Sequence, residues 1–212
     1  MDIIDFVLHI DKHLETFISN YGIWVYFLLF IIVFCETGLV VTPFLPGDSL
    51  LFAAGALAAN PSNNLNVGII IVSLIIAALL GDNTNYFMGR YLAKKGAGAK
   101  LFGIFTIRKD YLDKTHVFYE KNGPRTIILA RFVPIVRTFA PFVAGVGSMT
   151  YKRYIMYCIV GAILWVTMLT LTGYAFGNIP WIKNNFEIVV FGIIGISLLP
   201  ILFEILKNKL KK

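Results

Sequence analysis

The chain has 212 residues, of which 58% are hydrophobic and only 15% charged, whereas about a quarter of a typical soluble domain is charged. Apolar runs long enough to cross a bilayer recur along it, which excludes an ordinary soluble domain. The net charge of +7 would suit a nucleic-acid binder, but the basic residues flank the apolar runs, as the positive-inside rule expects of cytoplasmic loops. We therefore expect an all-α integral membrane protein, a polytopic helical bundle that binds no nucleic acid.

Residues 1–20 are predicted to form an amphipathic helix that lies on the membrane surface. Apolar side chains recur at helical spacing from Ile3 to Ile18, with charged ones such as Lys12 on the other side. His9 and His13 are four residues apart on this helix, which can suit a metal ion. Because no third ligand lies nearby, we predict no metal site.

An acidic hairpin is predicted over about 23–59. The apolar run 23–35 is short for a full crossing and meets Glu36, and Pro46 and Gly47 then interrupt the chain next to Asp48. Irregular backbone is tolerated at membrane depth where protein buries it, so a segment that enters and returns fits this pattern. This hairpin places the N-terminus outside; a full crossing by 23–41 would place it in the cytoplasm instead.

A membrane span follows at about 67–89, with Asp82 inside it or at its end. Two interpretations of Asp82 have equal weight: a solvated or helix-capping carboxylate, or a buried partner for an arginine. The loop 90–125 carries nine Lys and Arg residues against three Asp and Glu residues, which predicts a cytoplasmic location.

The segment 126–147 combines two arginines, Arg131 and Arg137, with two prolines, Pro134 and Pro141, in an otherwise apolar run. Arginine at membrane depth indicates a functional site by default. The prolines, with a glycine after them, are expected to break a helix rather than continue it. A break at Pro134 can direct both arginines toward one point.

Further spans are predicted at about 154–177 and 188–206, followed by a basic cytoplasmic tail at 207–212. Together, residues 21–206 make one membrane domain. If the loop 90–125, the turn after 147 and the tail are all cytoplasmic, the segment 126–147 must leave and return on one side. The two re-entrant hairpins then enter from opposite faces, an inverted-repeat arrangement found in many transporters.

The opposite charges on these two hairpins suggest a site for an anionic phosphate group. Two guanidiniums presented together bind oxyanions through paired hydrogen bonds. Glu36 and Asp48 would neutralise Arg131 and Arg137 when the site is empty, or carry a proton. The alternative is a structural role, in which these buried ion pairs only fix the packing of the two hairpins. Burying such pairs is costly, so they are weak evidence for a role in stability.

An enzyme is not indicated. The three histidines lie away from the arginine segment, no nucleophile stands beside a base, and no phosphate-cradling glycine loop is present. We therefore expect no catalytic residues and no cofactor.

The same residues carry a resemblance to a known family. The chain resembles the DedA family, part of the VTT (SNARE-associated) superfamily, over nearly its whole length, and two long motifs in the right order make the match specific. The matching stretches are Phe34–Gly38 through Phe44–Leu51, Gly81–Asp82 with Tyr86 and Gly89–Arg90, Arg131–Pro134 through Arg137–Thr138 to Ala144–Gly145, and Gly161–Trp165.

This resemblance implies a protein of the bacterial inner membrane with two opposed re-entrant hairpins. It implies a role in moving lipids between leaflets, as a flippase or scramblase for undecaprenyl phosphate or phospholipids, and in membrane homeostasis that depends on the proton motive force. Glu36, Asp48, Arg131 and Arg137 match residues that the family is reported to need. Membrane lipids are the expected partners, protons are candidate partners, and the sequence is compatible with an oligomer.

Two other classes of function stay open. One is a proton- or cation-coupled antiporter of small molecules, in which effects on lipids are indirect. The other is a membrane scaffold that transports nothing, in which the charges serve folding alone.

Overall fold

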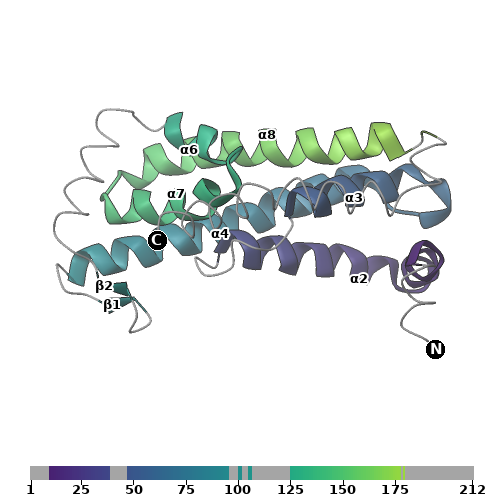
Figure 1. Cartoon of the computed structure of the whole chain (residues 1–212), viewed down its shortest axis with the longest axis horizontal. Helices are drawn as coiled ribbons and strands as arrows, with labels where there is room; N and C mark the ends of the chain where they lie inside the picture. The colour runs from purple at the N-terminus through teal and green to yellow at the C-terminus, as the bar shows by residue number, and fades with distance from the viewer. Residues whose placement is uncertain are drawn as a thin grey trace, which may run out of the picture. The chain divides into compact units, whose positions relative to one another are not determined.

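The computed structural model describes residues 10–38, 47–95, 100–101, 105–106, 125–177 and 179 (Figure 1). These residues are helical almost throughout. The helices are α2 (Ile10–Gly38), α3 (Gly47–Ala59), α4 (Val67–Lys95), α6 (Arg125–Ala130), α7 (Pro134–Val146) and α8 (Tyr151–Gly177), and a short 3-10 turn, η1 (Pro61–Asn63), follows α3. Strands β1 (Lys100–Leu101) and β2 (Phe105–Thr106) form one short antiparallel pair. Apart from this pair, the predicted all-α class is confirmed.

Helices α4 and α8, with 29 and 27 residues, are both long and apolar enough to cross a membrane, and an 18-residue stretch of each has a mean hydropathy of 2.0. At about 1.5 Å per residue, each helix exceeds a hydrocarbon core of about 30 Å. On α4, large apolar side chains are exposed at helical spacing: Ile69, Val72, Ile76 and Leu80. A continuous exposed apolar stripe of this kind suits lipid rather than water. The third predicted span, 188–206, and the tail lie outside the described residues.

Helix α2 runs without interruption from Ile10 through Gly22 to Gly38. It thereby joins the second half of the predicted surface helix to the apolar run that was expected to begin a hairpin. Glu36 lies in the last turn of α2. The residues between Gly38 and Gly47, including Pro46, lie outside the described part of the chain.

Helix α4 begins where Asn66 caps it. The side-chain oxygen of Asn66 accepts hydrogen bonds from the backbone N–H groups of Gly68 (2.9 Å) and Ile69 (3.2 Å), which a new helix leaves without partners. Its own backbone N–H donates to the hydroxyl of Tyr26 (2.8 Å). The turn before it places Asn64 in the left-handed region (φ 50°), which asparagine tolerates.

The chain divides into two compact units. The first comprises the residues up to Ile32, Pro46–Leu74 and the residues from Val166 onward, and the second comprises Val33–Leu45 and Ile75–Trp165. In the first unit, α3 packs closely on the second half of α8, because a Cβ atom on Gly55 would lie 2.0 Å from the carbonyl oxygen of Thr170. In the second unit, α7 packs equally closely on α4.

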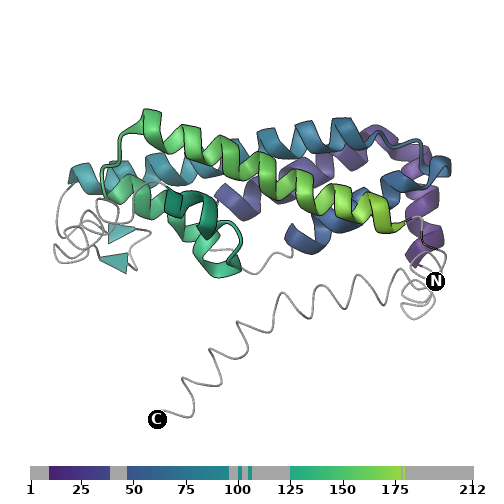
Figure 2. The same ribbon diagram turned by 90° about the horizontal axis from the view of Figure 1, so that it is seen from above.

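The contact between α7 and α4 also depends on glycine. A Cβ atom on Gly145 would lie 2.1 Å from the carbonyl oxygen of Tyr86, and one on Gly89 would lie 2.2 Å from that of Phe142. Only glycine permits such an approach of two helix backbones. Figure 2 shows α6 and α7 as two short helices with a bend between them.

Candidate functional site

The arginine segment consists of α6, a turn at residues 131–133, and α7. Helix α7 begins at Pro134, whose ring lacks the backbone N–H that a continuing helix would need. Arg131 therefore lies in the turn. Arg137 lies in the first turns of α7, where its backbone N–H donates to the carbonyl of Val133 (3.0 Å). Both arginines are buried, with 6% and 8% of their surface exposed.

Pro141 corrects one expectation. The sequence predicted that both prolines break the helix, but Pro141 lies inside α7, which continues to Val146. The prediction was wrong for Pro141, because a proline inside a helix removes one hydrogen bond and can bend the helix without ending it. The break at Pro134 is confirmed.

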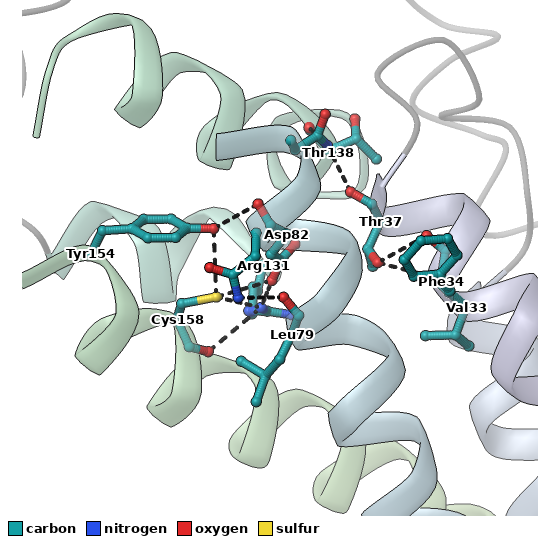
Figure 3. Close-up of polar contacts among 11 residues, drawn as sticks. Val33, Phe34, Thr37, Leu79, Asp82, Arg131, Thr138, Tyr154 and Cys158 are labelled. Atoms are coloured by element: carbon teal, nitrogen blue, oxygen red, sulfur yellow. Dashed lines mark hydrogen bonds and ion pairs between the residues drawn. The ribbon is translucent and has the colours of Figure 1, made fainter. Parts of the chain in front are cut away.

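Arg131 forms a buried ion pair with Asp82 of α4 (Figure 3). The Sγ atom of Cys158 lies 3.2 Å from the Asp82 carboxylate and 3.4 Å from the Arg131 guanidinium. The hydroxyl of Tyr154 donates to the backbone carbonyl of Asp82 (2.9 Å). Gly161 leaves room for the arginine, because a Cβ atom there would lie 2.9 Å from Arg131 Cδ. Of the two interpretations of Asp82, the structure favours a buried partner for an arginine.

Arg137 forms a second buried ion pair, with Glu36 at the end of α2. The Glu36 residue has 0% of its surface exposed. The guanidinium carbon of Arg137 also lies 4.8 Å from the ring centroid of Trp165, within the range of an attractive cation–π contact. The indole ring of Trp165 and the carboxylate of Glu36 thus both contact the guanidinium and fix its position.

Asn85 connects the helices that carry this second pair. Its Nδ2 donates to the backbone carbonyl of Thr37 (2.6 Å) and to that of Thr138 (3.1 Å). These two threonines directly follow Glu36 and Arg137 in the chain. Figure 3 shows Thr37, which lies on α2, and Thr138, which lies on α7.

Helix α4 approaches the end of α2 closely where the two ion pairs are built. A Cβ atom on Gly81 would lie 2.0 Å from Thr37 Oγ1 and 2.8 Å from the backbone nitrogen of Gly38. Gly81 precedes Asp82, and Asn85 follows Asp82 by three residues, so these residues lie toward one side of α4. One side of α4 therefore contacts α2, the turn at Arg131 and α7.

Asp48 and Gly47, which the sequence also assigned to the site, belong to the first unit. Asp48 is half-buried in the first turn of α3, where a carboxylate interacts favourably with the helix dipole. Gly47 is buried, and Pro46 lies outside the described residues.

The arrangement offers two guanidiniums, each neutralised by one carboxylate, inside a single unit. Taking such charges out of water is costly, and their mutual attraction offsets the cost only with good geometry. Within the described ranges, no group of three His, Cys, Asp or Glu side chains could hold a metal ion. A guanidinium that is paired with a carboxylate is able to bind another oxyanion in its place.

Sequence reasoning missed several residues of this site. No role in the site was assigned from the sequence to Cys158, Trp165, Asn85 or Tyr154. Two signals were present. Asn85 lies three residues after Asp82, and Cys158 lies four residues after Tyr154, so each pair shares a helix face.

Comparison with known proteins identifies the relatives of this chain. A family model described as the VTT domain matches residues 45–175. Protein DedA of Escherichia coli (strain K12) is 55% identical over 210 residues, which cover 98% of this chain and 94% of that protein. An uncharacterized membrane protein of Mycobacterium tuberculosis (strain H37Rv) is 43% identical over 177 residues, covering 82% and 75% of the two chains. The inner membrane protein YghB of E. coli (strain K12) is 32% identical over 216 residues, covering 97% and 92%.

No solved structure gives a significant match. The relatives named as membrane or inner membrane proteins, together with α4 and α8, show a multi-pass membrane protein. The family model spans more than half of the chain, and the relatives are matched over most of their lengths. This chain therefore belongs to the DedA family of VTT-domain membrane proteins.

Proposed function

We propose that this protein moves a phosphate-bearing lipid, such as undecaprenyl phosphate or a phospholipid, between the leaflets of the bacterial inner membrane. The observation that carries the proposal is the pair of buried arginines on one broken helix, each ion-paired with a carboxylate on another helix. A transport site needs charges that a substrate can engage and then release. Two neutralised guanidiniums meet that need for an anionic head group.

The cost of separating a buried pair favours phosphate as the competing ligand. Leaving one partner of such a pair alone costs about 3–5 kcal/mol. Arg131 and Arg137 can therefore leave Asp82 and Glu36 only for an equally strong acceptor. Phosphate oxygens provide charge-assisted, bidentate acceptors of this kind. A carboxylate left behind would be stabilised by taking up a proton, which would couple transport to a proton gradient.

Lipid access is supported by the outer side of the arginine segment. While Arg137 and Thr138 are buried, the neighbouring large apolar residues are exposed: Phe132, Val133, Val136 and Phe139. Apolar side chains on one side of the segment would face lipid, and the charged side chains lie on the other. A head group could thus reach the arginines while its acyl chain stays among apolar groups.

The order of elements supports the proposed inverted repeat. A helix, a 13-residue helix and a long helix follow one another as α2, α3 and α4, and again as α6, α7 and α8. Each 13-residue helix packs through glycine on the long helix of the other series, α3 on α8 and α7 on α4. We propose that the segments of about 23–59 and 126–147 form re-entrant hairpins that enter from opposite faces, with the C-terminus cytoplasmic and the N-terminus outside. Asp48, in the first turn of α3, is proposed as a further proton-carrying residue.

The test is lipid flipping by the purified protein in liposomes, with labelled undecaprenyl phosphate, a labelled phospholipid, and an imposed proton gradient. We expect transport of one of these lipids, and its loss in Arg131→Ala and Arg137→Ala. Arg125→Ala is the matched control, because Arg125 lies on the same segment but is exposed. Retained transport in the Arg131→Ala, Arg137→Ala double variant would overturn the assignment.

A coupled antiporter is the second candidate, favoured by the buried carboxylates Glu36 and Asp82. Such an antiporter binds protons and cations in turn at a carboxylate. It predicts ion flux driven by a pH gradient in liposomes that contain neither labelled lipid. Flux that survives the loss of both arginines but not of the carboxylates would favour it over lipid transport. Folded protein without flux of either kind would favour a scaffold.

A further inference from the structure

Asn85 is fully buried in the second unit, with 0% of its surface exposed. Its amide nitrogen donates to two backbone carbonyls, those of Thr37 and Thr138. Because both partners are acceptors, the amide nitrogen and not the amide oxygen must face them. One side chain on α4 thus binds the last turn of α2 and the first turns of α7.

The two carbonyls stand next to the charges of the site. Thr37 follows Glu36, and Thr138 follows Arg137. These two charged side chains form the ion pair between α2 and α7. We propose that Asn85 is a positioning residue of the transport site, which holds the two backbones together while the ion pair between them opens and re-forms. The inference rests on the proposed function.

The two hydrogen bonds of its amide nitrogen stabilise the fold, but they do not account for the amide oxygen of Asn85. The side-chain oxygen of Asn85 is buried and has no hydrogen-bond partner among the described residues. A buried acceptor without a partner is destabilising, which offsets part of what the two hydrogen bonds of the amide nitrogen contribute. Packing of this stretch of α4 is already supplied by the adjacent Tyr86, whose ring stacks on that of Tyr154 at 4.2 Å.

The geometry explains why a neutral amide suits this task. When a phosphate draws Arg137 away from Glu36, the attraction between α2 and α7 is lost. The hydrogen bonds of Asn85 carry no charge, so they persist whether the pair is open or closed. Asn85 therefore keeps α2 and α7 at a fixed separation, so that Arg137 can pair with Glu36 again after the lipid leaves. Loss of Asn85 should lower the maximal transport rate more than it lowers the affinity for the lipid.

The experiment compares Asn85→Leu and Asn85→Asp with the same changes at Asn83. Asn83 lies on the same helix, but its amide donates to its own helix at Leu79 (2.7 Å) and its oxygen accepts from Tyr151 (3.0 Å). The readouts are thermal unfolding, the lipid concentration at half-maximal transport, and the maximal rate. We expect Asn85→Leu to remain folded and to lower the maximal rate at least about tenfold, with half-saturation little changed. The Asn83 variants should resemble wild type.

Asn85→Asp adds a readout that a merely structural role would not change. An ionised carboxylate repels both carbonyls, whereas a protonated one can donate to one of them. The ratio of its rate to that of wild type at the same pH should therefore rise as the pH falls. The ratio removes the titration of the charged groups that wild type shares, the Asp82–Arg131 and Glu36–Arg137 pairs. The Asn83→Asp ratio should stay flat, and this test holds even if Asn85→Leu fails to fold.

The outcomes separate the two proposals. Wild-type protein that moves no lipid would overturn the proposed function and this inference with it. Wild-type transport with Asn85 variants that match the Asn83 controls would overturn the inference alone. So would a flat ratio for Asn85→Asp, or a loss confined to lipid affinity.

Discussion

The carboxylate of Glu36, in the last turn of α2, binds the guanidinium of Arg137, in the first turns of α7, although 101 positions separate them in the chain. The pair joins two helices that are far apart in the sequence. We also propose that a lipid phosphate opens this pair during transport by displacing Glu36 from Arg137.

Arg137→Lys tests whether transport requires the paired N–H donors of the guanidinium or only its positive charge. Lysine keeps the charge but cannot bind a phosphate through two parallel bonds, and it stacks less well on Trp165. We expect transport to fall roughly tenfold or more, corresponding to a loss of at least about 1.4 kcal/mol, at an unchanged protein level. Arg125→Lys on the same segment is the control. Full activity of Arg137→Lys would show that charge alone suffices.

Removing one charge of the Glu36–Arg137 pair should destabilise the protein more than removing both. Glu36→Ala leaves a buried guanidinium without its carboxylate, which costs about 3–5 kcal/mol. The double variant Glu36→Ala, Arg137→Met removes the remaining charge and should recover much of that loss. The free energy of unfolding in detergent is measured for both variants. Lys152→Ala is the control, because Lys152 is exposed and its loss should change that free energy by almost nothing. A double variant less stable than Glu36→Ala alone would contradict the account.

Gly161→Ala tests how closely the Arg131 side chain must be held against Asp82 for transport. The added Cβ atom would lie 2.9 Å from Cδ of Arg131, so the arginine side chain must shift away from Asp82. Alanine is also the better helix former, by roughly 1 kcal/mol. We expect lower transport and a lower unfolding temperature, with the better helix propensity of alanine offsetting only part of the weakened ion pair. Gly22→Ala is the matched control, because no atom lies within 4 Å of its added Cβ; equal transport in the two variants would contradict this role of Gly161.

Cysteine labelling tests the predicted topology. Arg125 and Lys152 are exposed and flank the segment 126–147, and Ser62 is exposed in η1. A re-entrant segment predicts that Arg125→Cys and Lys152→Cys react with an impermeant thiol reagent only from the cytoplasm, and Ser62→Cys only from outside. The unmodified protein sets the background. Labelling of positions 125 and 152 from opposite faces would show that the segment crosses the membrane.

The sequence was sufficient for the charges and the helix break, because their physical signals are local. Arginines and acids inside apolar runs are rare, and Pro134 cannot continue a helix, so Arg131, Arg137 and Glu36 could be identified as buried without any tertiary information. Asp82 was left between two interpretations, because position on a helix does not reveal what packs against it.

The missed residues share a different cause. Asn85 acts through backbone carbonyls of two distant elements, and no pattern in the sequence marks a carbonyl as an acceptor. Cys158 lies among apolar residues of α8, and only tertiary packing places its sulfur beside Asp82. The continuation of α7 past Pro141 was also missed, because propensity rules give probable helix ends that packing can override.

The fluorescence of Trp165 tests most directly whether a lipid phosphate displaces the carboxylate at Arg137. Trp165 is buried, and its ring lies 4.8 Å from the guanidinium carbon, so it reports the movement of that group. In protein whose other two tryptophans are replaced (Trp24→Phe, Trp181→Phe), a polyprenyl phosphate is titrated, with the corresponding polyprenol as control. The account predicts a saturable change with the phosphate alone, and its loss in Arg137→Ala. No change on saturation, or the same change in Arg137→Ala, would contradict it.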